Sequence, residues 1–254
     1  NDAFAEACDE AGIRFIGPAP ASMRVLGDKE AARKTMIANG FPVVPGSDGT
    51  VDTLKEAVAA AKSIGYPLMI KAAKGGGGKG IRIVEDACAL EREFPLVRRE
   101  AELAFGDGSV YLEAYLPQAR HIEVQILADM NGNVLHLGTR ECTLQRKNQK
   151  LIEEAPAANI PEATRAAIEQ TAVDIARAVG YQNAGTVEFL LTRDGRFFFM
   201  EMNARIQVEH PITESIFGLD LIKAQIQVAM GHHIRISQEN LIPRGHAIEC
   251  RINA

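Results

Sequence analysis

Two glutamates in the C-terminal half of this 254-residue chain have the spacing of metal ligands on a β-hairpin. An Asp-Gly pair at residues 194–195 lies between two apolar runs, which is a strong hairpin signal, so the sequence predicts a two-residue turn there. Counting outward from that turn pairs Glu188 with Glu201, and Phe189 with Met200. Like charges directly opposite on a sheet repel each other. A divalent cation between the two carboxylates would remove that repulsion.

Polar residues recur at every second position after Glu201 and extend this candidate site. They are Asn203, Arg205, Gln207 and Glu209. Because side chains alternate across a strand, these residues would share one face if the strand continues. Two carboxylates and the amide oxygen of Asn203 suit Mg²⁺ or Mn²⁺, and such an ion keeps ligand positions for substrate phosphates. The pattern therefore indicates nucleotide chemistry, and the alternative is a solvated strand face where water screens the carboxylates.

A run of four glycines lies in the segment KAAKGGGGKG, at residues 71–80, between predicted strands at 66–72 and 80–85. It is not a Walker A motif, because neither Ser nor Thr follows Lys79. Glycine lets backbone amides approach a polyphosphate closely, and Lys71 can supply a positive charge to its oxygens. We expect a lid over ATP here, and the alternative is a flexible surface loop.

A second hairpin is predicted around residues 131–132, which read Asn-Gly. Its register places Glu123 opposite Arg140, an arrangement typical of an ordinary opposite-charge pair. His121, on the same predicted face as Glu123, is more typical of a structural histidine than of a metal ligand. In the basic segment that follows, Lys150 is the residue that an anion site would use, and a solvated loop is the alternative.

The composition predicts a globular α+β protein with a substantial core. Hydrophobic residues make up 46% of the chain, and its helical and strand-like segments do not follow a regular βαβ alternation. A net charge of −5 argues against nucleic acid or an anionic membrane as a partner. No apolar run approaches the roughly 18 residues of a membrane helix. No signal-peptide pattern is present, so we expect the cytoplasm, or an organelle matrix after processing.

Eight segments, in order along the chain, resemble the biotin carboxylase family. They read GDKEAARK, MIKAAKGGGGKGIRIV, YLEAYL, RHIEVQ, QRKNQKLIEEAPA, AGTVEFL, EMNARIQVEHPITE and GHAIECRINA. Biotin carboxylase is the ATP-grasp component of acetyl-CoA, propionyl-CoA and pyruvate carboxylases, the first of which serves fatty acid biosynthesis. The resemblance covers the whole chain, and EMNxRxQVEHPxTE is its specific motif.

The resemblance implies an α+β fold of the ATP-grasp type. On that basis, residues 1–43 are a remnant of an N-terminal domain with its linker. Residues 44–115 form a small lid subdomain, and residues 116–254 form an incomplete C-terminal subdomain with an antiparallel sheet. The chain is expected to be truncated at both ends, because family members carry further sequence before Asn1 and after Ala254.

Matching positions also imply the site residues. Nucleotide contacts would be Lys29, Lys71, Gly77, Gly78, Glu113, Ala114, Tyr115, Leu116, His121, Gln145, Asn148, Glu188 and Glu201. Metal ligands would be Glu188, Glu201 and Asn203, the set that the hairpin already predicts. Bicarbonate and biotin would be bound by Lys150, Arg205, Gln207, Val208 and Arg251. The catalytic residues would be Lys150, Arg205 and Glu209, with Glu209 as the base. Asn148 departs from the family, which commonly has a histidine there.

The implied activity is ATP-dependent carboxylation of biotin by bicarbonate through carboxyphosphate. It would use ATP, Mg²⁺ or Mn²⁺, bicarbonate, and biotin as a substrate on a carrier protein or domain. A carboxyltransferase component would be a partner, and the intact parent would be a homodimer. The alternatives are another ATP-grasp ligase that phosphorylates bicarbonate, as in carbamoyl-phosphate synthetase, and an inactive nucleotide-binding fragment.

Overall fold

The computed structural model describes residues 1–73, 80–147 and 149–252. The predictions for Gly77, Gly78 and Asn148 therefore lie outside the described residues. The chain forms two compact units. The larger unit comprises Asn1–Pro42, Ala119–Gln145 and Lys150–Ala254, and the smaller unit comprises Val43–Gln118 and Arg146–Gln149. The predicted division at residues 43 and 115 stays a prediction.

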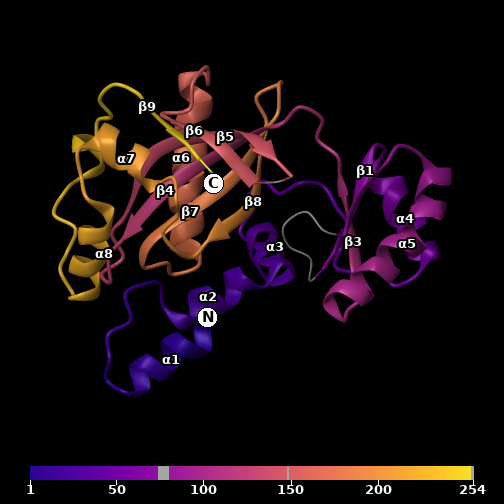
Figure 1. Cartoon of the computed structure of the whole chain (residues 1–254), viewed down its shortest axis with the longest axis horizontal. Coiled ribbons are helices and arrows are strands. Elements are labelled where there is room, and N and C mark those ends of the chain that lie inside the picture. The colour runs from indigo at the N-terminus through magenta and orange to yellow at the C-terminus, as the bar shows by residue number, and fades with distance from the viewer. Residues whose placement is uncertain (74–79, 148, 253–254) are drawn as a thin grey trace. The chain divides into compact units, whose positions relative to one another are not determined.

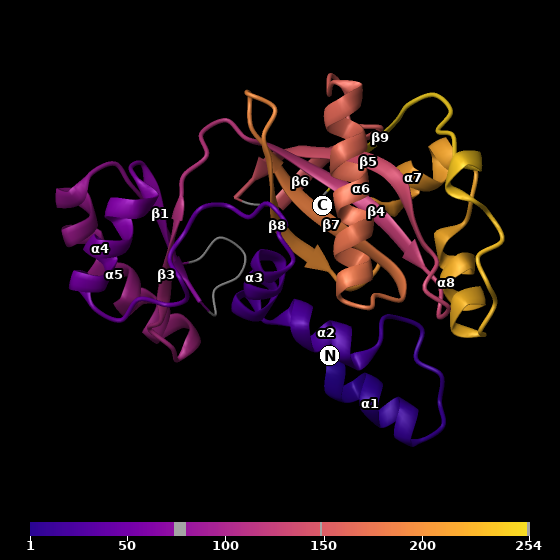
Figure 2. The same ribbon diagram turned by 180° about the vertical axis from the view of Figure 1, so that it is seen from behind.

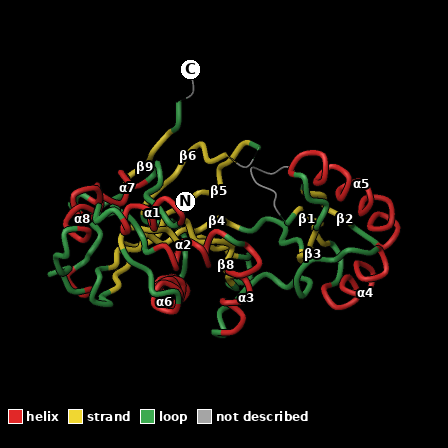
Figure 3. The backbone as a smooth tube through the Cα atoms, turned by 90° about the horizontal axis from the view of Figure 1, so that it is seen from below, coloured by secondary structure: helices red, strands yellow, loops and turns green. Residues whose placement is uncertain are grey.

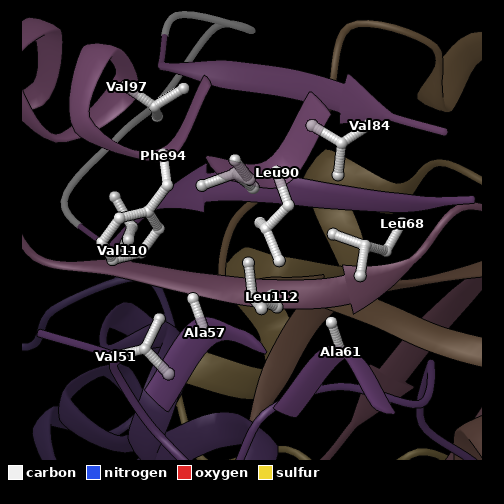
Figure 4. Close-up of a cluster of buried hydrophobic side chains, with 11 residues drawn as sticks. Val51, Ala57, Ala61, Leu68, Val84, Leu90, Phe94, Val97, Val110 and Leu112 are labelled. Carbon is white, nitrogen blue, oxygen red and sulfur yellow. The ribbon is translucent and has the colours of Figure 1, made fainter. Parts of the chain in front are cut away.

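The smaller unit is a three-stranded antiparallel sheet packed with two helices. Its strands are β1 (Leu68–Ala72), β2 (Ile81–Val84) and β3 (Val110–Ala114), in the order β2-β1-β3, and its helices are α4 (Leu54–Ile64) and α5 (Ala87–Phe105). A capping box between Thr53 and Glu56 begins α4. Leu90 and Phe94 of α5 point into a cluster of buried apolar side chains from the sheet and α4 (Figure 4). This core fixes the strands that flank the glycine run.

The larger unit is built on a six-stranded sheet in the order β8-β7-β4-β5-β6-β9 (Figure 1). Its strands are β4 (Arg120–Ala128), β5 (Val134–Arg146), β6 (Gln149–Ala155), β7 (Asn183–Leu191), β8 (Phe197–Asn203) and β9 (Ala247–Cys250). The pairings β4-β5, β4-β7, β6-β9 and β7-β8 are antiparallel. The predicted α+β class with an antiparallel sheet is confirmed.

The larger unit also contains helices, several of which contact the sheet. They are α1 (Asp2–Glu10), α2 (Pro20–Gly27), α3 (Lys29–Ala38), α6 (Glu162–Ala178), α7 (His210–Phe217), α8 (Leu221–Ala229) and a 3₁₀ turn at Gln238–Asn240. Helix α6 lies across one face, in front of the sheet in Figure 2 and seen nearly end-on in Figure 3. Helices α2 and α3 contact β8. In the described part of the chain, no helix has the length and apolar character needed to cross a membrane.

Both hairpins have a longer loop than predicted, and a β-bulge in each compensates for it. At the first, Asp129 N–H donates to Asn133 O at 2.9 Å, and at the second Thr192 N–H donates to Arg196 O at 2.8 Å. Each loop therefore has three residues and ends in a glycine with positive φ, a common hairpin type. The predicted pairing of Phe189 with Met200 is wrong, since Phe189 pairs with Phe199.

The bulges restore the predicted register away from the loops. The register of β7 against β8 shifts between Glu188 and Phe189, so Glu188 pairs with Glu201 as predicted. The register of β4 against β5 shifts likewise, and Glu123 pairs with Arg140 as predicted. Strand β8 ends at Asn203, however, so the expected continuation of the strand through Glu209 is wrong.

Candidate functional site

A row of charged residues crosses four neighbouring strands of the larger sheet. Arg140 of β5 pairs with Glu123 of β4, Glu123 pairs with Glu188 of β7, and Glu188 pairs with Glu201 of β8. Arg140, Glu123 and Glu188 are each at most 3% exposed, so the solvated-face alternative for the Glu188–Glu201 pair is wrong for Glu188. Three carboxylates standing side by side need compensating cations.

The first compensating cation is Arg140, whose guanidinium makes six hydrogen bonds. Its Nε and Nη2 donate to Glu123 Oε2 at 3.2 and 3.1 Å. The remaining partners are Gln125 Oε1 (2.7 Å), Thr213 Oγ1 (3.0 Å), Thr186 Oγ1 (3.1 Å) and Gln207 Oε1 (3.1 Å). The Glu123–Arg140 pair is thus the centre of a buried network and not the ordinary pair expected from the sequence.

The second cation is Lys150, which lies among three carboxylates. Its Nζ contacts Glu123 Oε1, lies 3.1 Å from Glu188 Oε1 and lies 2.7 Å from Glu209 Oε1. The side chain is 13% exposed, so the solvated-loop alternative is wrong for this residue. An ammonium shared by several carboxylates is a donor that an anion could recruit.

Glu188 accepts more donors than any other carboxylate of the site. Its Oε1 accepts from Asn203 Nδ2 at 2.8 Å and Gln207 Nε2 at 3.0 Å, in addition to Lys150. His121 Nε2 lies 2.8 Å from Oε2. Burial acts to raise the pKa of Glu188, but His121, Lys150 and Gln207 outweigh it and lower that pKa to about 2. Glu188 is therefore ionised at neutral pH.

Glu209 is a buried carboxylate held between two cations. It occupies the N-cap position of α7, with Lys150 at 2.7 Å from Oε1 and Arg251 Nη2 at 2.9 Å from Oε2. Arg251 is oriented by Glu153, whose Oε1 accepts from its Nε at 2.7 Å. Burial acts to raise the pKa of Glu209, but Lys150 and Arg140 lower it below the ordinary value. The result is an ionised proton acceptor beside two anion-binding groups.

The predicted metal ligands fit a hard divalent cation. Glu188 and Glu201 stand opposite each other, and Asn203 contacts Glu188. Among the described residues, Glu201 has no hydrogen-bond or ion-pair partner, so its oxygens are available to a cation. A second group of possible ligands, His121, Glu123 and Glu188, fits less well because Lys150 already contacts both carboxylates. The set of Glu188, Glu201 and Asn203 thus has the oxygen donors that Mg²⁺ prefers.

Two predicted site residues are exposed. Arg205 is exposed, and its guanidinium donates to Ile206 O at 3.2 Å and Asn203 Oδ1 at 3.3 Å. Val208 is 60% exposed. Both follow the end of β8, where the backbone turns towards α7 and the alternation of the strand is lost.

The predicted nucleotide contacts are divided between the two units. In the larger unit, Lys29 begins α3, and Gln145 Nε2 lies 2.8 Å from His121 Nδ1. In the smaller unit, Lys71 Nζ donates to Glu113 Oε2 at 2.5 Å. The backbone N–H groups of Ala114 and Tyr115 donate to Pro45 O and Pro67 O, and Leu116 follows them in the same unit.

Sequence reasoning missed the residues that surround the row. They are Gln125, Thr186, Thr213 and Glu153, together with the central role of Arg140. The available signal was the alternation within the fourth and seventh strands, where Gln125 and Thr186 stand two residues from Glu123 and Glu188. A polar residue at a position that should face a core predicts a buried network.

The sequence of this chain is similar to those of known proteins. Residues 28–237 match the family described as the carbamoyl-phosphate synthase L chain, ATP binding domain. The chain is 52% identical over 254 residues to a biotin carboxylase of Nostoc and 48% identical over 255 residues to biotin carboxylase 1 of Bacillus subtilis, covering 100% of this chain in both cases. The chain belongs to the biotin carboxylase family. It spans 57% of the length of each of these two relatives.

Solved structures of the biotin carboxylase family give the same fold. A biotin carboxylase from Campylobacter jejuni is 47% identical and superimposes with a TM-score of 0.93, over 99% of this chain and 56% of that one. The biotin carboxylase domain of a Hydrogenobacter thermophilus 2-oxoglutarate carboxylase, solved with MgADP, ADP and bicarbonate, is also 47% identical with a TM-score of 0.93. It is covered over 56% of its length. The expected ATP-grasp fold is confirmed.

Proposed function

We propose that this chain carries the ATP-grasp site of a biotin carboxylase, which phosphorylates bicarbonate with ATP and carboxylates biotin. The observation that carries the proposal is the position of Glu209, an ionised buried carboxylate within 3 Å of both Lys150 and Arg251. A base flanked by two cations suits the deprotonation of a bound monoanion, because the cations stabilise the dianion that forms.

The proposed reaction begins with bicarbonate between Lys150 and Arg251. Glu209 takes its proton, and an oxygen of the dianion attacks the γ-phosphorus of ATP, so that ADP leaves and carboxyphosphate forms. Carboxyphosphate then breaks at its C–O bond into CO₂ and phosphate. The phosphate accepts the N1 proton of biotin, and the biotin nitrogen attacks CO₂ to give carboxybiotin. Glu209 then releases its proton to solvent, which restores the base.

Binding of the anion also explains how Glu209 becomes basic enough. Lys150 lowers the pKa of Glu209, and Arg251 contacts the other oxygen of its carboxylate. When both cations also contact bicarbonate, they stabilise the Glu209 carboxylate less. The pKa of Glu209 then rises towards its ordinary value. Substrate binding therefore activates the base.

The metal and nucleotide assignments are part of the proposal. A bound divalent cation supplies positive charge to the phosphates of ATP, and Glu188, Glu201 and Asn203 would hold it. The resemblance implies that the nucleotide itself would be held by Lys29, Lys71, Gly77, Gly78, Glu113, Ala114, Tyr115, Leu116, His121, Gln145 and Asn148. Either Mg²⁺ or Mn²⁺ suits the oxygen ligands.

The proposed partners follow from the reaction and from the relatives. Biotin would arrive on a carrier protein or domain, and carboxybiotin would leave to a carboxyltransferase component. A relative from Caenorhabditis elegans is named pyruvate carboxylase 1 and is 50% identical over 252 residues, covering 21% of that longer protein. We propose a homodimer for the intact parent, located in the cytoplasm or an organelle matrix.

The test is bicarbonate-dependent ADP release from Mg-ATP, measured with and without free biotin. We expect release to require bicarbonate and to rise when biotin is added, because biotin consumes the CO₂ that forms. Release that depends on bicarbonate but not on biotin would favour the carbamoyl-phosphate synthetase type of ligase. Nucleotide binding without any release would contradict the proposed activity of this chain.

A further inference from the structure

Arg140 is a fully buried charged group of the site, and the proposed reaction gives it no role. Its side chain is 0% exposed, and it donates to five different residues from β4, β7, α7 and the loop between β8 and α7. Burying a guanidinium is costly, and an apolar side chain of similar size often stabilises a fold as well or better. An arginine with this many oriented partners therefore calls for a role other than stability.

The contact with Gln207 fixes which end of that amide faces the site. Arginine has only donors, so the atom of Gln207 that faces Arg140 Nη2 must be the oxygen. The Nε2 group of Gln207 is then turned the other way, where it donates to Glu188 Oε1 at 3.0 Å. Without the arginine, the amide could rotate and present an oxygen to an anion, which would repel it.

The contact with Glu123 has a parallel effect on Lys150. Two N–H groups of Arg140 hold Glu123 Oε2, which leaves Oε1 to contact the Lys150 ammonium. Lys150 is thereby held within reach of Glu209. One guanidinium therefore orients two separate N–H donors, the amide of Gln207 and the ammonium of Lys150.

We propose that Arg140 is a positioning residue that turns the N–H groups of Gln207 and Lys150 towards the anion site and so sets the affinity for bicarbonate without contacting it. This inference rests on the proposed function, because it takes bicarbonate as the anion. The orientation of Gln207 is a property of the ligand-free protein and is tested separately.

The central variant is Arg140→Lys, which keeps the charge but lacks the forked donors. A second variant, Arg140→Gln with Glu123→Gln, replaces the buried ion pair with two amides and serves if the first does not fold. The control is Thr213→Val, which removes one hydrogen bond to Arg140 and leaves the contact with Gln207. The affinities for bicarbonate and for MgADP are measured by calorimetry on the same samples.

We expect Arg140→Lys to weaken bicarbonate binding by about tenfold or more, the size expected for a lost charge-assisted hydrogen bond, with MgADP affinity within about threefold of the parent. Thr213→Val should change both affinities by less than about threefold. Adding Gln207→Met to Arg140→Lys should cost less than the sum of the separate losses, because part of the effect of Arg140 acts through the Gln207 amide. Equal losses of bicarbonate and MgADP affinity, or additive losses, would overturn the proposal.

The ligand-free test is ¹⁵N NMR of the Gln207 side-chain amide, assigned by its absence in Gln207→Met. We expect its protons to be protected from exchange in the parent and in Thr213→Val, and unprotected in Arg140→Lys. Protection that survives Arg140→Lys would overturn the inference. If the parent shows this protection but binds no bicarbonate, the orientation stands while the proposed function and the anion role of Arg140 both fail.

Discussion

Lys150 connects the candidate metal ligand Glu188 to the candidate base Glu209. Its ammonium contacts carboxylates from three different segments. A cation bound at Glu188 and an anion bound beside Glu209 would both redistribute this shared charge. Glu188 would lose its need for Lys150 once a metal neutralised it, and Lys150 would then be more available to bicarbonate. Under the proposed function, cation and anion binding would therefore favour each other.

Replacing Glu209 with glutamine tests whether this residue accepts the proton of bicarbonate. Glu209→Gln keeps the size of the side chain but cannot accept the proton, so we expect bicarbonate-dependent ADP release to fall by about 100-fold or more. The affinity for MgADP should stay within about threefold, since Glu209 is not among the proposed nucleotide contacts. Steady-state ADP release and calorimetry measure these quantities. ADP release at the parental rate would contradict the assignment of Glu209 as the base that deprotonates bicarbonate.

Glu201→Gln tests the metal site. The carboxylate of Glu201 would be lost from a set of three oxygen donors, so we expect Mg²⁺-dependent ADP affinity to fall by about tenfold or more. ADP affinity measured without Mg²⁺ should not change. The matched control is Glu154→Gln on β6, a glutamate of the same sheet outside the charged row. Similar effects of the two substitutions would contradict the assigned ligand set.

At the scale of secondary structure, two bulged hairpins determine where the charged row forms. Each has a three-residue loop and one extra residue further along, and together these bring Glu123 opposite Arg140 and Glu188 opposite Glu201. In β5 the register shift includes Gly138, which has φ +64°. An added Cβ there would lie 3.2 Å from the Phe217 ring.

Gly138→Ala therefore combines backbone strain with a close contact. We expect it to lower the free energy of unfolding by about 2–3 kcal/mol. Gly132→Ala, in the loop of the same hairpin, has φ +87° and no atom within 4 Å of the new Cβ, so it should cost only about 1 kcal/mol. Denaturant titrations of both variants measure the difference. Equal losses would show that the bulge is not constrained by Phe217.

A partly buried glutamate on α6 makes stability depend on pH. Burial raises the pKa of Glu169 from its ordinary value of 4.5 to about 7, with Arg165 opposing and Glu162 reinforcing the shift on the same helix. The group that faces it from β5 is His136, at 3.9 Å, whose own pKa is lowered by burial. Because the folded state binds the proton more tightly, the stability from this group is present below pH 4.5 and lost as pH rises through 7.

Glu169→Gln removes this dependence. We expect the variant to be more stable than the parent by about 2 kcal/mol at pH 8 and nearly equal to it at pH 5, as measured by thermal unfolding. Glu162→Gln, at an exposed position of α6, should show no such gain at pH 8. A gain of the same size at both pH values would mean that the effect comes from packing and not from the charge.

Over the whole molecule, the sequence predicted the class, the hairpins and much of the site. Alternation and Asp-Gly or Asn-Gly signals were sufficient to pair Glu188 with Glu201 and Glu123 with Arg140. The pairing of β4 with β7 joins strands about 60 residues apart, and no local sequence pattern predicts it. For that reason the adjacency of Glu123 and Glu188, and with it the network around Arg140, could be found only in the folded structure.

The residue at which β8 ends could not be predicted from the local sequence either. Asn203 to Glu209 keeps the polar and apolar alternation of a strand, but the chain turns at residue 204 so that Glu209 can begin α7. Tertiary contacts of Gln207 and Glu209 with Arg140, Glu188 and Lys150 hold the turn in place. Here buried polar contacts override the local pattern.

An oxygen-labelling experiment tests most directly whether this site phosphorylates bicarbonate. The chain is incubated with Mg-ATP, biotin and ¹⁸O-labelled bicarbonate, and the phosphate released is analysed by mass spectrometry. The account predicts one labelled oxygen in each phosphate, because the bicarbonate oxygen that attacks the γ-phosphorus stays on it when carboxyphosphate breaks. Phosphate without the label would show that water attacks ATP, and it would contradict the assignment of this site to bicarbonate phosphorylation.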